Sequence, residues 1–206
     1  MMHLDPDNFK HRLATAHPMR EKIRREMMYT GRKVPFDGGH VVWKESAVLM
    51  ILWKENAVWH TLLMQRNEYH GAHSGQISFP GGRREPSDQN LWETALRETQ
   101  EETGIAPSAL QFLGDLSPLH IPVSGFFVHP FVAVHHGKPS FRPDPREVHH
   151  LVEAPLHVLF AVKTKQNLTI QGNILQDVPG YAYGNYFIWG ATAMMLREAE
   201  FLFHQR

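Results

Sequence analysis

Residues 79–105 read FPGGRREPSDQNLWETALRETQEETGI, and this stretch decides how the rest of the chain is interpreted. It opens with a proline and two glycines, which predict a turn. Ser87 or Asp88 then supplies a helix N-cap, and Gly104 stands just past the expected last turn of the helix. The apolar stripe that would anchor this helix to a core consists of Trp92, Ala95, Leu96, Thr99 and Thr103.

Three glutamates, Glu98, Glu101 and Glu102, follow one another on one side of the predicted helix. At about 100° of rotation per residue, Glu98 and Glu102 stack at i and i+4, and Glu101 lies beside them. Like charges at this spacing destabilise a helix, so they indicate either a solvated acidic face or a bound cation. Mg²⁺ suits the second case, because it takes a few carboxylates, keeps several waters and is completed by substrate phosphates. Without metal, the clustered carboxylates should raise at least one of their own pKa values.

In this order the residues resemble the Nudix box, which members of that family write as G-x5-E-x7-R-E-U-x-E-E-x-G-U, with U apolar. The second half of the box is filled by Arg97, Glu98, Glu101, Glu102, Gly104 and Ile105. Thr99 stands at its first apolar position. The first half departs from the pattern: Gly82 and Asp88 align with its Gly and Glu only when one extra residue is allowed before the Arg.

That variant resembles the coenzyme A diphosphatase branch of the family, which carries a second signature upstream of the box. Residues 62–82, LLMQRNEYHGAHSGQISFPGG, resemble the branch pattern LL-x-x-R…H-x-G-Q-I-x-F-P-G-G. Gly71 and Met64 stand where that branch often has Arg and Thr. The resemblance implies an α/β fold, a Nudix-type α/β/α sandwich with a mixed β-sheet.

The resemblance also implies a site that uses Mg²⁺ or Mn²⁺. Glu98 and Glu102 would be metal ligands, with Glu101 beside them as a third. The general base is open between a glutamate of the box and one from a later loop, where Glu147 is the candidate. Glu147 is also explained as an ordinary carboxylate at the start of a strand.

Substrate contacts are expected from the loop that leads into the box. Glycine permits close backbone approach to a phosphate. The expected contacts are Arg66, His73, Gly75, Gln76, Phe79, Gly81 and Gly82. Phe79 is equally explained by core packing. Arg83 and Arg84 could meet an extra phosphate, such as the 3′-phosphate of coenzyme A, or could simply be exposed.

Composition narrows the class of protein. The 206 residues include 21 Lys plus Arg, 21 Asp plus Glu and no Cys, so no global charge points to nucleic acid or to an acidic membrane surface. No segment approaches the roughly 20 apolar residues of a membrane span, and the first residues lack the apolar core of a signal peptide. We therefore expect a cytoplasmic enzyme with a small-molecule diphosphate substrate. Whether it forms a homo-oligomer is open.

Hydrophobic patterning gives the remaining elements. Residues 7–29 indicate a basic helical region broken near Pro18, and residues 30–46 a linker. Two strands, 47–53 and 57–66, form a hairpin around residues 54–56, and the first should be central because it is apolar on both faces. Further strands are expected at 110–116, 126–134, 147–155, 168–170 and 181–188, with a helical turn at 156–160, loops at 120–125 and 137–146, and a helix at 190–203. Residues 1–45 are expected as a helical extension of the same domain, and 46–206 as the Nudix hydrolase domain.

The leading function is hydrolysis of the diphosphate in coenzyme A or its derivatives, giving 3′,5′-ADP and 4′-phosphopantetheine. A second enzymatic interpretation keeps the metal chemistry and changes the substrate to ADP-ribose, a dinucleotide or a nucleoside triphosphate. A third interpretation is a non-catalytic, nucleotide-sensing regulator. The intact glutamate set argues against it.

Overall fold

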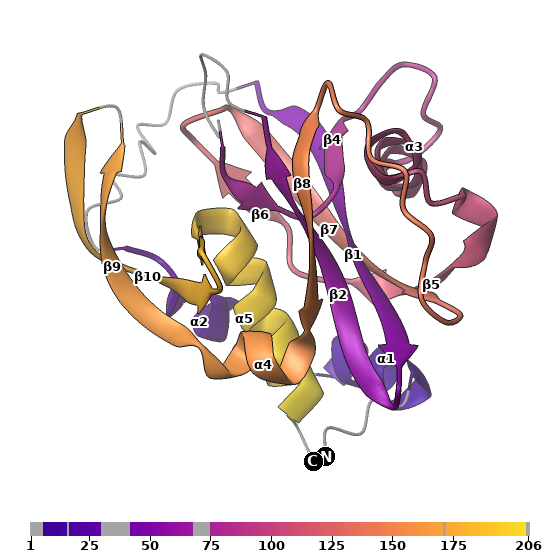
Figure 1. Ribbon diagram of the computed structural model, residues 1–206, viewed down its shortest axis with the longest axis horizontal. Coiled ribbons are helices and arrows are strands. Elements are labelled where there is room, and N and C mark those ends of the chain that lie inside the picture. The colour runs from indigo at the N-terminus through magenta and orange to yellow at the C-terminus, as the bar shows by residue number, and fades with distance from the viewer. Residues whose placement is uncertain (1–5, 16, 30–41, 68–74, 171, 205–206) are drawn as a thin grey trace. The chain divides into compact units, whose positions relative to one another are not determined.

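A computed structural model describes residues 6–15, 17–29, 42–67, 75–170 and 172–204 of the chain (Figure 1). The chain divides into two compact units. The box unit, residues 39–156, contains the glycine and glutamate stretch, whereas the terminal unit combines residues 1–38 with residues 157–206. Within the described residues, no helix is long and apolar enough to cross a membrane.

The box unit is built on a mixed eight-stranded sheet. Its strands are β1 (Lys44–Glu55), β2 (Val58–Arg66), β3 (Ile77–Ser78), β4 (Gly81–Arg83), β5 (Leu110–Asp115), β6 (Leu119–Ile121), β7 (Phe126–His135) and β8 (Val148–Pro155). The main order is β3-β2-β1-β7-β5, while β4 pairs with β1, β6 with β7 and β8 with β2. Among the described strand pairs of this sheet, only β1 and β7 run parallel. The central position predicted for the first strand is confirmed.

The first strand is buried on both faces, as its unbroken apolar run predicts. Leu49, Met50, Ile51 and Leu52 are each no more than 1% exposed. One of these faces packs against α3 (Leu91–Thr103), which lies beside β4 and β1 in Figure 1. The buried cluster there includes Leu49, Ile51 and Trp53 of β1 and Ala95 of the helix. The predicted α/β class, with a helix packed on a mixed sheet, is confirmed.

Three expectations for the box unit are wrong in detail. Gly81–Arg83 is a strand paired with β1, not a turn. The first strand begins at Lys44, within the expected linker, because its edge pairs with both β4 and β7. The expected loops at 67–78 and 120–125 each contain a short strand, β3 and β6. In all of these cases a partner strand supplies hydrogen bonds that local residue preference cannot reveal.

The predicted hairpin between β1 and β2 is confirmed, with a tighter turn than expected. Asn56 and Ala57 occupy positive φ angles of 48° and 64°, as a two-residue turn requires. The strands at 110–115, 126–135 and 148–155 also lie where the sequence predicts them. A short 3₁₀ helix (Pro107–Ala109) precedes β5.

The terminal unit joins the two ends of the sequence. Its described elements are α1 (Pro6–Thr15), α2 (His17–Arg25), α4 (Leu156–Ala161, whose first residue still belongs to the box unit), β9 (Lys163–Ile170), β10 (Asn173–Tyr183), β11 (Tyr186–Trp189) and α5 (Gly190–His204). The helix predicted at 190–203 is confirmed. Pro18 lies in the first turn of α2, and residue 16, between α1 and α2, is outside the described residues, so the break predicted near Pro18 stays a prediction. The expected final pair of strands is wrong: three strands form a separate sheet in the order β11-β10-β9, and the expected strand at 181–188 is divided between β10 and β11.

Candidate active site

The glutamate-bearing helix α3 is fixed at both ends. Asn90 is its N-cap, and the Asn90 side-chain oxygen accepts a hydrogen bond from the Glu93 N–H at 3.0 Å. The Glu93 carboxylate in turn accepts from the Gln89 N–H at 2.9 Å. The expectation of Ser87 or Asp88 as the cap is therefore wrong, because the loop continues for two residues beyond Asp88. Gly104 ends the helix at φ 77°, as predicted.

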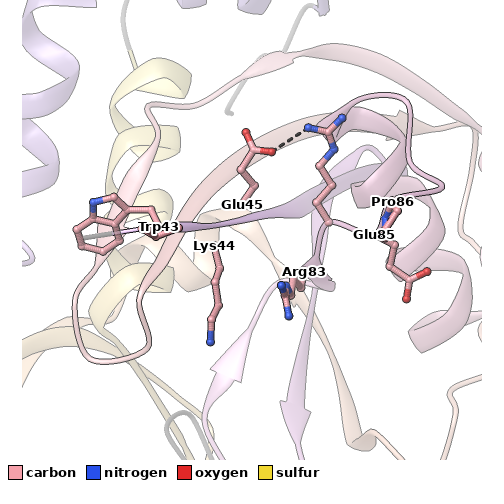
Figure 2. Close-up of a pocket in the computed structure, with 8 residues that line it drawn as sticks. Trp43, Lys44, Glu45, Arg83, Glu85 and Pro86 are labelled. Atoms are coloured by element: carbon pink, nitrogen blue, oxygen red, sulfur yellow. Dashed lines mark hydrogen bonds and ion pairs between the residues drawn. The ribbon is translucent and has the colours of Figure 1, made fainter. Parts of the chain in front are cut away.

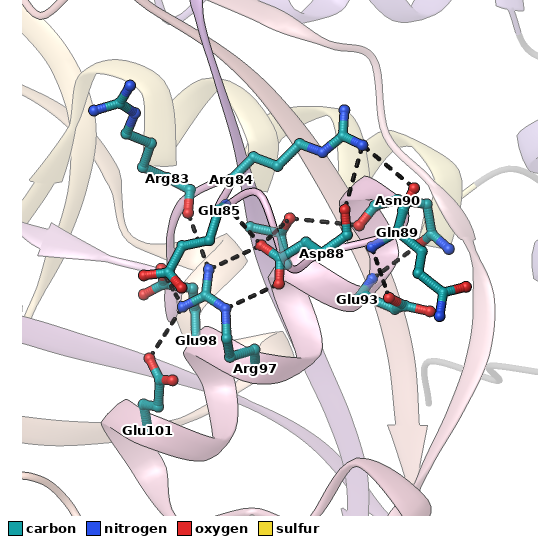
Figure 3. A network of polar contacts seen from close by, with 11 residues as sticks. Arg83, Arg84, Glu85, Asp88, Gln89, Asn90, Glu93, Arg97, Glu98 and Glu101 are labelled. Atoms are coloured by element: carbon teal, nitrogen blue, oxygen red, sulfur yellow. Dashed lines mark hydrogen bonds and ion pairs between the residues drawn. The ribbon is translucent and has the colours of Figure 1, made fainter.

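Asp88 instead anchors the loop to the helix (Figure 3). Its carboxylate accepts two hydrogen bonds of 3.0 Å from the Arg97 guanidinium, and further bonds from the Thr94 hydroxyl and the Glu85 N–H. The hydrogen bonds from Arg97 hold the pKa of Asp88 well below its usual range. The aspartate that aligns with the first glutamate of the box is thus a buried structural anion.

Arg97 connects this loop to the acidic face. Its guanidinium donates to Glu98 at 2.9 Å, to Glu101 at 3.1 Å and to the Arg83 carbonyl at 3.0 Å (Figure 3). Arg97 thus has a structural role, since it pairs with carboxylates and with a loop carbonyl. Neighbouring side chains diverge by about 100° on a helix. The Arg97 side chain is nevertheless long enough for its guanidinium to contact the Glu98 carboxylate.

Glu102 is the most enclosed carboxylate of the set. Its side chain is 1% exposed, and one oxygen accepts a hydrogen bond from the Gly81 N–H at 2.7 Å. The other oxygen, Oε1, is buried without a hydrogen-bond partner and lies 3.7 Å from the Arg66 guanidinium. Burial raises the pKa of Glu102 to about 8, against the opposing effects of Arg66 and of the Gly81 hydrogen bond.

Glu98 lies next to the second glycine of the turn. A Cβ atom at Gly82 would collide with the Glu98 carboxylate, so only glycine leaves that carboxylate its place. Burial raises the pKa of Glu98, the Arg97 contacts lower it, and the charges of Glu101 and Glu147 raise it further. The expected rise in carboxyl pKa is confirmed, with burial rather than mutual repulsion as the larger cause.

The other two acidic candidates are more open. The Glu101 side chain is 57% exposed. Glu147 immediately precedes β8, is exposed, and accepts a backbone hydrogen bond from the Asn67 N–H at 3.1 Å. Its charge raises the pKa of both Glu98 and Glu102, which places it within electrostatic reach of the two buried carboxylates.

These residues suit a hard divalent cation that is only partly held by protein. Among the described residues, no group of three His, Asp or Glu side chains is arranged so that it could hold a metal ion as a cage. Mg²⁺ needs no such cage, since one or two carboxylates, waters and substrate phosphates complete its shell. The buried Oε1 atom of Glu102 fits this role, because it accepts no hydrogen bond and its ion pair with Arg66 is long, at 3.7 Å.

The upstream residues take different places. The Arg66 guanidinium donates to the Gly81 carbonyl at 2.7 Å, so it braces the glycine strand next to Glu102. Gly75 has φ 66°, and the Gln76 carbonyl accepts from the Arg66 N–H at 3.1 Å. Phe79 is 1% exposed and fits the packing role that the sequence left open. His73 lies outside the described residues.

The two glycines of the box are required by packing as well as by any ligand. Gly81 has φ 147°, and a Cβ there would collide with the Ala47 carbonyl and with Val48 of β1. Spacing in the sequence could not reveal this close approach, since the partner strand lies more than thirty residues upstream.

Comparisons with known proteins identify the family. The family model described as NUDIX domain matches residues 43–177. The chain is 39% identical over 138 residues to proteins named "Uncharacterized Nudix hydrolase NudL" from Yersinia pestis (strain Pestoides F) and Yersinia pseudotuberculosis serotype O:1b (strain IP 31758). Each alignment covers 66% of this chain and 69% of the relative.

Solved structures of the same family are also matched. A Nudix hydrolase from M. smegmatis, RenU, aligns with a TM-score of 0.49 and 17% identity over 57% of this chain and 74% of that chain. Across the family, catalysis generally uses divalent metal ions, as the carboxylates here would allow. The matched domain spans the glycine strand, the capped helix and the three glutamates, and this chain belongs to the Nudix hydrolase family.

Proposed function

We propose that this Nudix hydrolase cleaves the diphosphate linkage of coenzyme A or its derivatives, giving 3′,5′-ADP and 4′-phosphopantetheine, with Mg²⁺ or Mn²⁺ as cofactor. The observation that carries the hydrolytic part is Glu102, a buried carboxylate next to the glycine strand. One of its oxygens accepts a hydrogen bond from Gly81, and the other accepts none and lies 3.7 Å from Arg66. The substrate part is supported by the upstream sequence signature, whose Arg66 contacts the same glycine strand.

The residues of the chain would divide the work as follows. Glu98 and Glu102 would hold the metal, with Glu101 at the exposed edge. Arg97 holds Glu98 and Glu101 in place, while Gly81 and Arg66 hold Glu102. When bound, a divalent metal neutralises phosphate charge, orients the substrate and makes a bound water more acidic.

Hydrolysis of the anhydride requires that a water oxygen attack one phosphorus, that the bridging P–O bond break, and that a base accept the proton of the water. We assign the base to Glu147 or to a glutamate of the box. Glu147 is supported by its exposure and by its electrostatic reach to Glu98 and Glu102. Gln76, Gly75, His73 and the backbone of Gly81 and Gly82 are the proposed contacts to the substrate.

A substrate panel tests the proposal. Purified protein would be assayed with coenzyme A, ADP-ribose, a dinucleotide and nucleoside triphosphates, with product identification. We expect cleavage of coenzyme A to 3′,5′-ADP, which is lost in chelator and restored by Mg²⁺ or Mn²⁺. Glu102→Gln should lower kcat by several orders of magnitude, because it removes the charge of a metal ligand and keeps its shape.

The outcomes are separable. If ADP-ribose or another nucleotide is cleaved in preference to coenzyme A, the protein is still a hydrolase but the assignment of coenzyme A as substrate is wrong. Wild-type turnover by Glu102→Gln at saturating metal would overturn the active site. Loss of less than about threefold in kcat for Glu147→Gln, under roughly 1 kcal/mol, would place the base within the box.

A further inference from the structure

A second feature of the box unit lies directly beside the glycine strand. A pocket of about 390 Å³ is lined by residues at the start of β1, at the end of β4 and just after β4 (Figure 2). Pockets of this volume lie in the range that holds small organic ligands. None of the glutamates on α3 lines it, so its chemistry differs from that of the metal site.

Two cations of this pocket lie on the same side of the paired strands. Arg83 is paired with Ser46, and Lys44 lies two residues before Ser46, so Lys44 and Arg83 share one face of the sheet. Figure 2 shows both side chains extending to that side. Both residues are exposed, and in the part of the chain that the structure describes neither makes an ion pair. The Lys44 ammonium lies only over the Phe126 ring, at 5.9 Å from its centroid.

The neighbouring arginine is used differently. Arg84 points to the opposite side, where its guanidinium donates to Glu45 at 2.8 Å and to the Asp88 and Gln89 carbonyls at 3.3 Å (Figure 2). Its charge is thus balanced within the loop. Glu85 also lines the pocket, but Figure 2 shows its carboxylate directed away from Lys44. Lys44 and Arg83 are therefore the two cations lining the pocket that make no ion pair in the described part of the chain.

Trp43 also lines the pocket, from the opposite face of the sheet. Trp43 is half-buried and meets the His120 ring edge-on, with centroids 4.7 Å apart, and His120 stacks on Phe127 at 4.3 Å. Because Phe127 pairs with both Glu45 and His120, this aromatic group lies on the face of Glu45 and Arg84, away from Lys44 and Arg83.

We propose that this pocket is a subsite for a phosphomonoester on the nucleoside part of the substrate, with Lys44 and Arg83 binding the phosphate. The proposal rests on the proposed function in one respect: the substrate is a nucleoside diphosphate derivative. Arg83 directly follows Gly82, and Lys44 lies three residues along β1 from Ala47, the partner of Gly82. At about 3.3 Å per strand residue this is roughly 10 Å, the scale of one nucleoside. In coenzyme A the group would be the 3′-phosphate.

A binding measurement without catalysis tests the subsite. Adenosine 3′,5′-bisphosphate and 5′-AMP would be titrated into the full chain in chelator by calorimetry. We expect the bisphosphate to bind about tenfold more tightly, or about 1.4 kcal/mol. Arg83→Gln and Lys44→Gln should each remove most of this preference. Lys54→Gln is the matched control, because Lys54 lies on the same strand and over an aromatic ring at the same 5.9 Å, outside the pocket.

Equal affinity of the wild type for the two nucleotides would overturn the proposal, as would an unchanged preference in both Arg83→Gln and Lys44→Gln. Turnover separates the subsite from the proposed function. If the subsite is correct, Arg83→Gln should lower kcat/KM for coenzyme A about tenfold more than for 3′-dephospho-coenzyme A. If the protein prefers the bisphosphate in binding but cleaves neither coenzyme A nor 3′-dephospho-coenzyme A, the subsite stands and the proposed substrate is wrong. Cleavage of coenzyme A and 3′-dephospho-coenzyme A with equal kcat/KM would keep the proposed function and remove the subsite.

Discussion

At the scale of single residues, the two glycines of β4 are required for different physical reasons. Gly82 faces the Glu98 carboxylate, which is the movable end of a side chain, whereas Gly81 faces the backbone of β1 at φ 147°. We expect Gly82→Ala to keep the fold and to displace Glu98. Titration with Mn²⁺ should then show metal affinity reduced at least tenfold, with unfolding free energy changed by under about 1 kcal/mol.

Gly81→Ala serves as the contrasting variant. Its Cβ would meet the Ala47 carbonyl, which cannot move without distorting the strand, so we expect destabilisation of roughly 3 kcal/mol or more in urea unfolding. Wild-type Mn²⁺ affinity in Gly82→Ala would mean that Glu98 is not a metal ligand at the position seen here.

At the scale of elements, the Asp88–Arg97 pair ties the loop after β4 to α3. Removing its charge in Asp88→Asn should cost about 2 kcal/mol of unfolding free energy, less than for a fully buried pair because the Arg97 side chain is 21% exposed. The pKa of Asp88 is lowered in the folded state, mainly by the Arg97 hydrogen bonds. The contribution is therefore fully present above the unfolded pKa of about 4 and is lost as pH falls below it.

Urea unfolding of the wild type and Asp88→Asn between pH 7 and pH 3 measures this. The difference between the two proteins should be largest at neutral pH and should shrink below about pH 4. A difference independent of pH would show that Asp88 contributes by packing and neutral hydrogen bonds instead of by charge.

The same elements show what the sequence can and cannot predict. The helix with Glu98 and Glu102, its end at Gly104 and the central strand follow from local periodicity and composition, and the structure has them all. The strand at Gly81–Arg83 does not follow, because it depends on pairing with β1 rather than on its own residues. Arg83 and Arg84 are indistinguishable as neighbours in sequence. Both line the pocket, but strand alternation places Arg83 on the side of Lys44 and Arg84 on the side of Glu45.

At the scale of the whole molecule, the terminal unit brings together residues from both ends of the chain. Arg20 of α2 donates to Glu198 of α5 at 2.6 Å, and the two side chains are 7% and 0% exposed. Removing one member of such a buried pair leaves an uncompensated charge, which typically costs 3–5 kcal/mol. The pair therefore links elements 178 residues apart in sequence.

We expect Glu198→Leu to lower the unfolding free energy by about 3 kcal/mol. The double variant Arg20→Met with Glu198→Leu should recover part of it, because the buried Arg20 charge is removed, whereas Arg24 still loses the charge of Glu198. Hydrogen exchange locates the effect: in Glu198→Leu, protection should fall first in α2 and α5, while α3 and β1 of the box unit keep wild-type protection, since each unit has its own buried core. A double variant as unstable as Glu198→Leu would assign the loss to packing at position 198. Equal loss of protection in α3 and α5 would show that the two units unfold as one.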